Sequence, residues 1–229
     1  MGKKNETKQL LFLTAAKLFY QHGYKKTTIR MIAQESGFAH VSFLYYYENK
    51  AELGAQIIDH YLRWLVGQTM LFIEQNDISE NDSLSRFLFY WTTHFYYLKT
   101  DELFGRFYRE FSNDESEAFY RVTAKYANPV FTDIFHLQYN RSEEELRIDF
   151  ILLNSIDATL SRLCSQGDLS VSGAVEKLLE MNVVAGYGKT ISKDEIDRFI
   201  KKYCFPMIGS SKGIYQRFID EGINPVLNA

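Results

Sequence analysis

The stretch TTIRMIAQESGFAHVSFLYYYENKAEL, residues 27–53, decides the fold. Thr27 or Thr28 can accept hydrogen bonds from the free amide groups at the start of a short helix. Gly37 ends this helix after about two turns, and a second short helix follows over residues 40–47. Two short helices joined by a glycine-containing turn are typical of a helix-turn-helix, which lays its second helix in the major groove of duplex DNA.

Helical periodicity at about 100° per residue divides residues 40–47 into two opposite arcs. The arc expected to pack inward holds Phe43, Leu44 and Tyr47. The arc expected to point outward holds Val41, Ser42 and Tyr45, with His40 at its start, Tyr46 beside it and Lys50 just beyond. This outward arc is compact and uncharged, which suits entry into a groove lined by phosphates.

The segments on either side also predict helices. An amphipathic helix over residues 7–22 ends at Gly23, and Asn49 caps a long helix that reaches about residue 75. A polar joint at residues 76–82 precedes an aromatic-rich remainder. That remainder predicts helices over residues 83–98, 101–112, 115–127, 129–138, 143–166, 171–185 and 193–205, with Pro206 ending or kinking the last. We therefore predict an all-α fold.

The composition agrees with a folded helical protein. The 229 residues are 46% hydrophobic and include only three prolines, so a core is available and helix breakers are few. Cys164 and Cys204 are too few for a disulfide framework, which favours a reducing compartment. The N-terminus is charged and no apolar run reaches about 18 residues, so we expect a cytoplasmic protein without a membrane partner.

The charge is unevenly distributed along the chain. Residues 1–50 carry eight basic and three acidic side chains, a net charge of +5, whereas the whole chain carries −3. A basic first unit on an acidic body suggests a polyanionic partner that touches only that unit. Chance clustering of charge on a solvated face is the alternative.

The same stretch resembles the DNA-binding signature of TetR-family transcriptional regulators over roughly residues 8–60. The resemblance rests on Thr28, Ile32, Ala33, Gly37, Tyr45 to Tyr47, Lys50 and Leu53. It implies a helix-turn-helix DNA-binding domain over residues 1–50 and a connecting helix over about 49–75. It also implies a larger helical domain over residues 76–229 that binds a small effector and forms a homodimer.

The resemblance also implies which residues contact double-stranded operator DNA. They are Thr27, Thr28, Arg30, His40, Val41, Ser42, Tyr45, Tyr46 and Lys50. Thr28 and Arg30 would meet phosphate or a base edge, the residues from His40 to Ser42 would face the groove, and the two tyrosines and Lys50 would bind phosphates. The alternatives are that Tyr45 to Tyr47 are packing aromatics, His40 a plain surface histidine and Lys50 a solvated charge.

Three positions depart from the family pattern. Ala39 replaces a small polar cap, Val41 replaces glycine or alanine, and Leu44 replaces the usual first aromatic phosphate contact. We infer that Tyr45 and Tyr46, whose hydroxyl groups donate hydrogen bonds, take over the phosphate contact. A contact of Val41 with thymine methyl groups and the shape of the DNA would then supply part of the specificity.

The body is unusually aromatic. Residues 87–111 contain eleven aromatic side chains, more than one inward stripe can hold, so some must line a cavity, an interface or the surface. We expect an effector site for a lipophilic or planar ligand formed by Trp91, Phe95, Phe107 and Phe111. A tightly filled core with tyrosine hydroxyls reaching solvent is the alternative.

The resemblance places the dimer interface on the later helices. We expect it to include Leu146, Phe150, Leu153, Ile156 and Leu160, together with Ile196, Phe199, Ile200 and Tyr203. Two copies of a helix-turn-helix related by a twofold axis would bind a pseudo-palindromic operator. The alternative is that these stripes belong to the core of one subunit.

The sequence contains no signature of catalysis or of a cofactor. The sequence has no GxSxG motif, no HExxH motif and no glycine-rich phosphate loop, so we expect that the protein is not an enzyme. His94 and His136 lack the surrounding ligands of a metal site, and we expect no metal or other cofactor. We expect Cys164 and Cys204 to be buried structural thiols rather than a redox switch.

These observations together predict a repressor that a small effector releases from its operator. Ligand binding among residues 83–138 would displace the helix over residues 49–75 and change the spacing of the two recognition helices. The alternative is a ligand-binding or sequestering helical protein of the same fold that has lost operator binding, which the three departures would permit. A helical enzyme for a lipophilic substrate would need a paired acid and base, which the sequence does not reveal.

Overall fold

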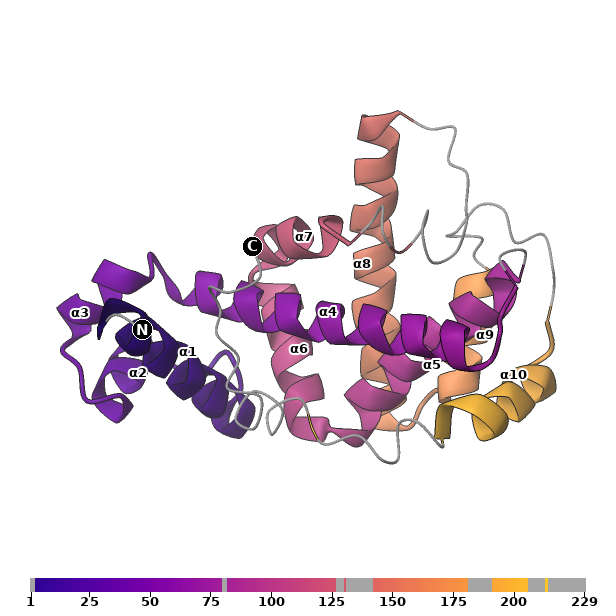
Figure 1. Ribbon diagram of the computed structural model, residues 1–229, viewed down its shortest axis with the longest axis horizontal. Coiled ribbons are helices and arrows are strands. Elements are labelled where there is room, and N and C mark those ends of the chain that lie inside the picture. The colour runs from indigo at the N-terminus through magenta and orange to yellow at the C-terminus, as the bar shows by residue number, and fades with distance from the viewer. Residues whose placement is uncertain are drawn as a thin grey trace.

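A computed structural model describes residues 3–79, 82–126, 130, 142–180, 191–205 and 213. Every regular element in these ranges is a helix, which confirms the all-α prediction (Figure 1). The predicted helix over residues 129–138, apart from Val130, lies outside the described residues, as do Pro206 and the end of the predicted helix over 171–185.

Three helices form the N-terminal unit: α1 (Lys3–His22), α2 (Ile29–Glu35) and α3 (His40–Tyr46). Their apolar faces meet in a small core that contains Leu11, Phe12, Ala15, Phe19, Ile32, Phe43 and Tyr47, all at most 1% exposed. Gly23 and Gly37 end α1 and α2 with φ angles of +84° and +76°. Only glycine adopts this region without strain, so these two residues set the turns that orient α2 and α3.

The long helix α4 (Lys50–Gln75) joins this unit to the body (Figure 1). The Asn49 side chain accepts a hydrogen bond from the Glu52 amide at 2.9 Å, so the predicted cap is confirmed. One face of α4 is buried along its whole length, from Leu53 near its start to Phe72 near its end. The same rigid helix therefore contacts both the helix-turn-helix and the body.

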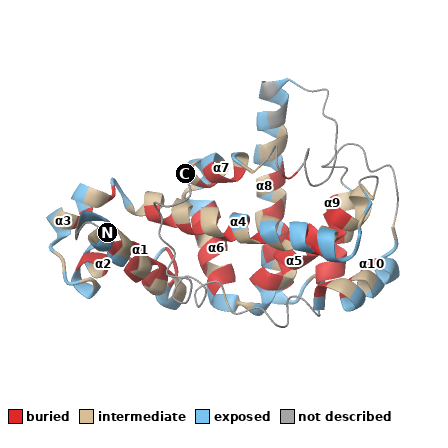
Figure 2. Cartoon of the chain, viewed as in Figure 1, coloured by how far each residue is buried: buried red, intermediate tan, exposed pale blue. Residues whose placement is uncertain are grey.

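Six further helices and a π-helical turn build the body around α4. They are α5 (Ser83–Thr100), α6 (Glu102–Asp114), α7 (Ser116–Ala124), α8 (Glu143–Gln166), α9 (Val171–Glu180), α10 (Lys193–Phe199) and the π turn η2 (Ile200–Cys204). Asp82, Ser142 and Ser192 cap α5, α8 and α10 through their side-chain oxygens. The buried residues concentrate where α4, α5, α6 and α8 meet (Figure 2).

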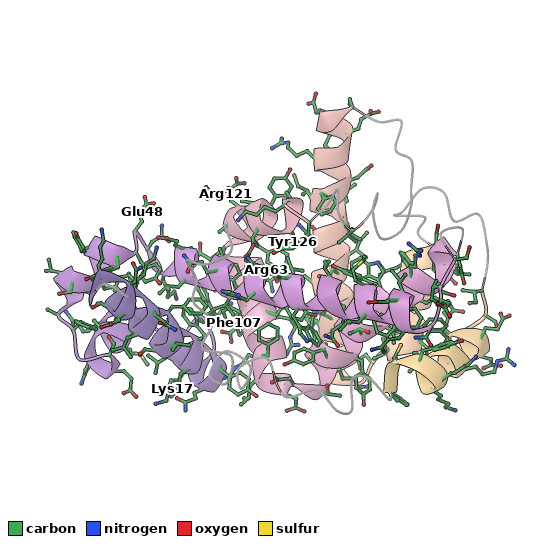
Figure 3. All side chains as sticks on the ribbon, in the orientation of Figure 1. Lys17, Glu48, Arg63, Phe107, Arg121 and Tyr126 are labelled. Carbon is green, nitrogen blue, oxygen red and sulfur yellow. The ribbon has the colours of Figure 1, made fainter. Side chains whose placement is uncertain are left out.

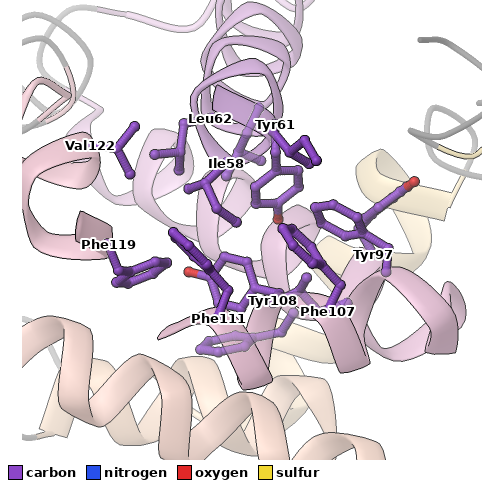
Figure 4. Close-up of a cluster of buried hydrophobic side chains, with 14 of the residues drawn as sticks. Ile58, Tyr61, Leu62, Tyr97, Phe107, Tyr108, Phe111, Phe119 and Val122 are labelled. Carbon is purple, nitrogen blue, oxygen red and sulfur yellow. The ribbon is translucent and has the colours of Figure 1, made fainter. Parts of the chain in front are cut away.

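Ten of the eleven aromatic side chains in residues 87–111 are buried, and only Tyr96 is half-buried. Helix α5 is surrounded by α4, α6, α8 and α9, so the whole run 86–95 is covered. Side chains from α4, α6 and α7 interlock beside it (Figure 4). Most of these aromatics therefore form a filled core, as the alternative interpretation states.

The predicted dimer stripe is wrong in its orientation. Leu153, Leu160, Ile196 and Ile200 are buried, and Phe150, Ile156, Phe199 and Tyr203 pack against the core of the same subunit. The stripe turns inward because α8 packs on α5, α6 and α7, and because η2 packs on α5. The side chain of Leu146 lies outside the described part of the structure.

Candidate nucleic-acid interface

The outward arc of α3 is open to solvent. Val41 is 78% exposed and Tyr45 is 69% exposed, whereas Phe43 and Tyr47 are buried beneath them. This arrangement confirms the predicted division of α3 for these four residues. Tyr47 is therefore a packing residue, as the alternative states.

The predicted inward position of Leu44 is wrong. It is 48% exposed and not packed inward. At about 100° per residue it lies roughly midway between the buried Phe43 and the exposed Tyr45. The ridge that α3 presents to solvent therefore consists of Val41, Leu44 and Tyr45, which is apolar and aromatic.

The remaining predicted groove residues lie at the edges of this ridge. His40 is exposed at the first position of α3, and Ser42 and Tyr46 are half-buried on its flank. The rings of Tyr45 and Tyr46 meet edge to face with their centroids 5.0 Å apart. Ala39 supplies no side-chain cap to α3, as expected for the departure at that position.

The start of α1 lies beside α3 and brings two lysines to the interface. The Tyr47 hydroxyl donates to the Lys8 carbonyl oxygen at 3.0 Å, and the Lys8 ammonium lies 5.3 Å from the centre of the Tyr47 ring. The Lys4 ammonium lies 5.3 Å from the centre of the exposed Tyr45 ring. Both lysines belong to the basic charge of residues 1–50 but were not predicted as site residues, because the contact between α1 and Tyr47 that brings them to α3 is tertiary.

The prediction that Thr27 lies on the DNA-binding surface is wrong. It is fully buried, and its hydroxyl donates to the carbonyl oxygens of Gly23 at 2.8 Å and Leu18 at 3.1 Å. Thr28, in contrast, is exposed and caps α2, with its side-chain oxygen accepting from the Met31 amide at 3.2 Å. Thr28 and the exposed Arg30 therefore remain on the predicted surface.

We expect Thr27→Val to lower the free energy of unfolding by about 1–2 kcal/mol, because valine keeps the volume but removes a buried hydrogen-bond donor. Urea denaturation measures this change. The folded variant should bind DNA with the same salt dependence as the wild type, because Thr27 does not reach the surface. A flatter salt dependence would place Thr27 on the DNA instead.

Lys50 links the start of α4 to the turn between α1 and α2 by hydrogen bonds. Its ammonium donates to the carbonyl oxygens of Tyr24 at 2.9 Å and Thr27 at 3.0 Å, and lies 3.9 Å from the centre of the Tyr24 ring. Burial lowers the pKa of Lys50, and the nearby carboxylates of Glu115 and Asp114 partly offset that shift. A contact of Lys50 with phosphate stays a prediction, and this ammonium already serves a structural purpose.

The body holds the same turn through an acidic cluster on α6 and at the start of α7. The Tyr24 hydroxyl donates to Glu115 at 2.7 Å, the Lys25 amide donates to Glu110 at 2.9 Å, and the Lys25 ammonium pairs with Asp114 at 3.2 Å. A methyl group on Gly23 would lie 2.6 Å from the Glu110 carboxylate, so no larger residue fits there without a shift. The helix-turn-helix is thus fixed to α6 by several polar contacts.

The body contains a narrow cavity of about 40 Å³ between α4, α5, α7 and α8. Its walls are Leu62, Tyr90, Trp91, His94, Tyr108, Thr123, Tyr126, Val130, Phe150, Leu153, Asn154 and Asp157. Of the four predicted effector residues, only Trp91 belongs to this wall. Phe95, Phe107 and Phe111 are buried elsewhere: Phe107 stacks on Phe19 of α1, and Phe111 fills the space beside Gly54 of α4.

Buried polar side chains form a continuous network along one side of this cavity. The Asp157 carboxylate accepts from Tyr108 at 2.6 Å and Ser161 at 3.2 Å, and lies 2.8 Å from His94 Nε2. His94 Nδ1 lies 2.7 Å from the Tyr61 hydroxyl. Burial, followed by the charge of Asp157, raises the pKa of Tyr108, so this phenol stays protonated and donates to the carboxylate.

His94, Cys164 and Cys204 are the described members of the histidine and cysteine pairs considered as further sites. His94 is engaged with Tyr61 and Asp157, and His136 lies outside the described part of the chain. In the described ranges, no group of three or more His, Cys, Asp or Glu side chains could hold a metal ion. Cys164 and Cys204 are buried free thiols, and burial raises the pKa of Cys164 to about 11, which keeps it a poor nucleophile.

The fold and the exposed ridge of α3 define a helix-turn-helix DNA-binding protein. Residues 11–57 match the model of the family described as bacterial regulatory proteins, tetR family. Over these residues, which span α1 to the first part of α4, the chain is similar to the DNA-binding domain of TetR-family transcriptional regulators.

The structure comparison adds one similar protein. A structure described as that of the fatty acid degradation regulator FadR from Bacillus halodurans is 14% identical to this chain, with a TM-score of 0.48. The similarity covers 82% of this chain and 98% of the other. The comparison with curated proteins gives no match. No described helix is both long and apolar enough to cross a membrane.

Proposed function

We propose that the protein is a cytoplasmic repressor that binds a pseudo-palindromic operator as a homodimer and is released by a small effector. The observation that carries the DNA-binding half is the solvent-facing ridge of α3, led by Val41 and Tyr45, beside the lysines of α1 and Arg30 of α2. The proposal assigns DNA recognition to residues 1–50, linkage to α4, and effector binding and dimerisation to residues 76–229.

Different residues of the ridge and its surroundings suit base contacts and phosphate contacts. Val41 offers methyl groups to thymine methyls, and His40 and Ser42 offer polar atoms to base edges. Tyr45 and Tyr46 carry hydroxyl groups, and Lys4, Lys8 and Arg30 carry charges, that suit phosphates. Because α3 carries no Arg, Asn or Gln for bidentate base contacts, DNA shape supplies part of the specificity.

His40→Ala and Arg30→Ala separate base contacts from phosphate contacts. On an operator selected from a random duplex library, Arg30→Ala should weaken binding to all sequences and flatten the logarithmic salt slope by about one unit per lost contact per subunit. His40→Ala should instead change the preferred sequence. Repeating the selection with each variant measures both effects, and a uniform loss from His40→Ala would contradict a groove position for that histidine.

We place the dimer interface on the outer face of α8. Ile148, Ile151 and Leu152 are 49%, 42% and 55% exposed, and they form the exposed apolar group on that helix. The same face continues through the small polar residues Ser155 and Thr159. Exposed apolar side chains gathered on one helix are typical of an interface, and two such helices from two subunits would pack against each other.

Leu152→Asp should convert the dimer into a monomer, because two carboxylates would meet across the twofold axis. Sedimentation measures the change, and the matched variant Leu103→Asp, at a residue of α6 that is 40% exposed, should stay dimeric. A Leu152→Asp protein that remains a dimer would move the interface to another face.

The effector half of the proposal rests on contacts between the cavity wall and α4. Tyr126 in the wall donates to the backbone and side-chain oxygens of Asp59 at 3.1 Å each, and the Arg63 side chain lies beside them (Figure 3). A ligand that widens the cavity would move Tyr126 and with it α4, whose first residue, Lys50, holds the turn before α2. A coupling of about 1–3 kcal/mol would release the operator, and operator DNA would weaken ligand binding by the same factor.

A sequestering protein of the same fold remains the second candidate. The observation that favours it is the absence of a side-chain cap at Ala39, since an uncapped α3 positions its residues less firmly. The solvent-exposed ridge of α3 and the exposed, positively charged side chain of Arg30 support operator binding instead.

A further inference from the structure

The cavity between α4, α5, α7 and α8 carries a chemical preference that the effector proposal does not specify. Resting on that proposed function, we propose that the cavity binds a compact, neutral, mainly apolar ligand with one hydrogen-bond acceptor of carbonyl type, which accepts from the indole N–H of Trp91. The ligand class follows from three properties of the wall: an indole N–H without an acceptor among the described residues, a carboxylate that already has three hydrogen-bonding partners within the protein, and aromatic surroundings.

The unused donor is Nε1 of Trp91. Trp91 is 6% exposed and lines the cavity, and its buried indole N–H has no hydrogen-bond partner among the described residues. Its aromatic neighbours in the described part of the chain include Tyr90, His94 and Phe95, with ring centroids 5.3, 5.5 and 5.8 Å away. A buried donor without an acceptor is unfavourable, so a ligand that supplies an acceptor gains the bond that the protein lacks.

The charge of the wall disfavours ionic ligands. Among the described lining residues, Asp157 carries the acidic side chain and none is Lys or Arg. A ligand carboxylate would therefore meet another carboxylate without a lysine or arginine to neutralise it. The Asp157 oxygens already interact with His94, Tyr108 and Ser161. A ligand cation would have to compete with these protein groups for the carboxylate.

The size of the cavity limits the ligand. A volume of about 40 Å³ is smaller than a benzene-sized ligand needs, so binding must widen the cavity. The half-buried side chains in the wall are those that can yield, and they include Tyr126 and Phe150. Movement of Tyr126 would disturb its bonds to Asp59 of α4, so a ligand of this class acts on the helix that leads to the DNA.

Four one-ring probes of nearly equal size test the proposal: acetophenone, ethylbenzene, benzoate and benzylamine. For the NMR experiment, Trp64 is replaced by phenylalanine. Trp91 is then the only tryptophan and gives the single indole resonance in a spectrum of ¹⁵N-labelled protein. We expect acetophenone to bind and to move the Trp91 indole proton downfield, as a new hydrogen bond does. Ethylbenzene should bind more weakly without that downfield shift, and benzoate and benzylamine should bind at least about tenfold more weakly than acetophenone.

Trp91→Phe, in the otherwise wild-type chain, is the matched control for the hydrogen bond. It keeps an aromatic ring in the wall and removes the N–H, so acetophenone affinity should fall about threefold to tenfold while ethylbenzene affinity stays within about twofold. Ligand-observed NMR titration measures both affinities in the wild type and the variant, and the amide spectrum of the variant reports whether it is folded.

Benzoate or benzylamine binding as tightly as acetophenone would overturn the proposed ligand class, and so would an unchanged Trp91 indole signal at saturating acetophenone. No binding by any probe would overturn it as well. These outcomes leave the DNA-binding proposal intact, because the titrations contain no DNA. If the probes bind as expected but leave operator affinity unchanged, the ligand class stands and the proposed effector response fails.

Discussion

Val41→Glu should reduce operator affinity by about 100-fold or more while the protein stays folded. The side chain at this position is 78% exposed at the head of the α3 ridge, so a carboxylate there costs the fold little. In the major groove the same carboxylate would face phosphates and lose the apolar contact with thymine methyls. Titration of a labelled duplex measures the loss, and circular dichroism measures the fold.

Leu103→Glu is the matched control for this prediction. It makes the same kind of change at a residue that is 40% exposed on α6, away from α3. This variant should bind the duplex as the wild type does. An equal loss in both variants would show a general effect of charge, and a Val41→Glu protein with wild-type affinity would remove α3 from the groove.

Asp157→Ala should lower the free energy of unfolding by about 3–5 kcal/mol, the largest effect that we expect from one polar side chain of the body. Asp157 is 3% exposed, and its oxygens hold His94, Tyr108 and Ser161. Its removal leaves these buried groups without their shared partner and opens a void in the core. Urea denaturation, with the denaturant slope checked for each variant, gives the change.

Ser161→Ala provides the scale for that measurement. It removes only the longest of the three contacts, at 3.2 Å, and should cost about 1 kcal/mol. If Asp157→Ala lowers the free energy of unfolding by no more than Ser161→Ala does, the hydrogen bonds of Asp157 do not stabilise the core, and this prediction is wrong.

Local sequence patterns correctly predicted the helices that the structure describes and much of α3. Helix caps at Asn49 and Thr28 and the left-handed glycines act within a few residues, so their effect is legible without tertiary structure. The exposed Val41 and Tyr45 followed from periodicity alone. The position of Leu44 was predicted wrongly because this residue lies at the boundary between the inward and outward arcs of α3. In a helix of two turns, periodicity does not determine whether a boundary residue is buried.

Contacts beyond a residue's own helix explain the burial of Thr27 and the structural role of Lys50. The Thr27 hydroxyl is buried against the carbonyl oxygen of Leu18 in α1, and the Lys50 ammonium is bound by carbonyl oxygens in the turn before α2. Periodicity predicted that the α8 stripe is apolar, but an apolar stripe serves a core and an interface equally well.

Helix α6 shows why the effector residues could not be separated from the core by sequence. Its Tyr108 points to the cavity network, whereas Phe107 packs against Phe19 of α1 and Arg106 donates to the carbonyl oxygens at the end of α1. Consecutive positions of one aromatic helix thus belong to two sites. The direction of each side chain is set by which neighbour α6 packs against.

Selection of binding sites from a random duplex library, followed by titration of the selected and a scrambled duplex across a salt series, tests the central claim most directly. We expect a pseudo-palindromic site, two subunits per duplex, and affinity that falls steeply with salt, by a logarithmic slope of about 0.9 per phosphate contact. Failure to enrich any sequence, with equal weak binding to both duplexes, would contradict operator recognition by α3.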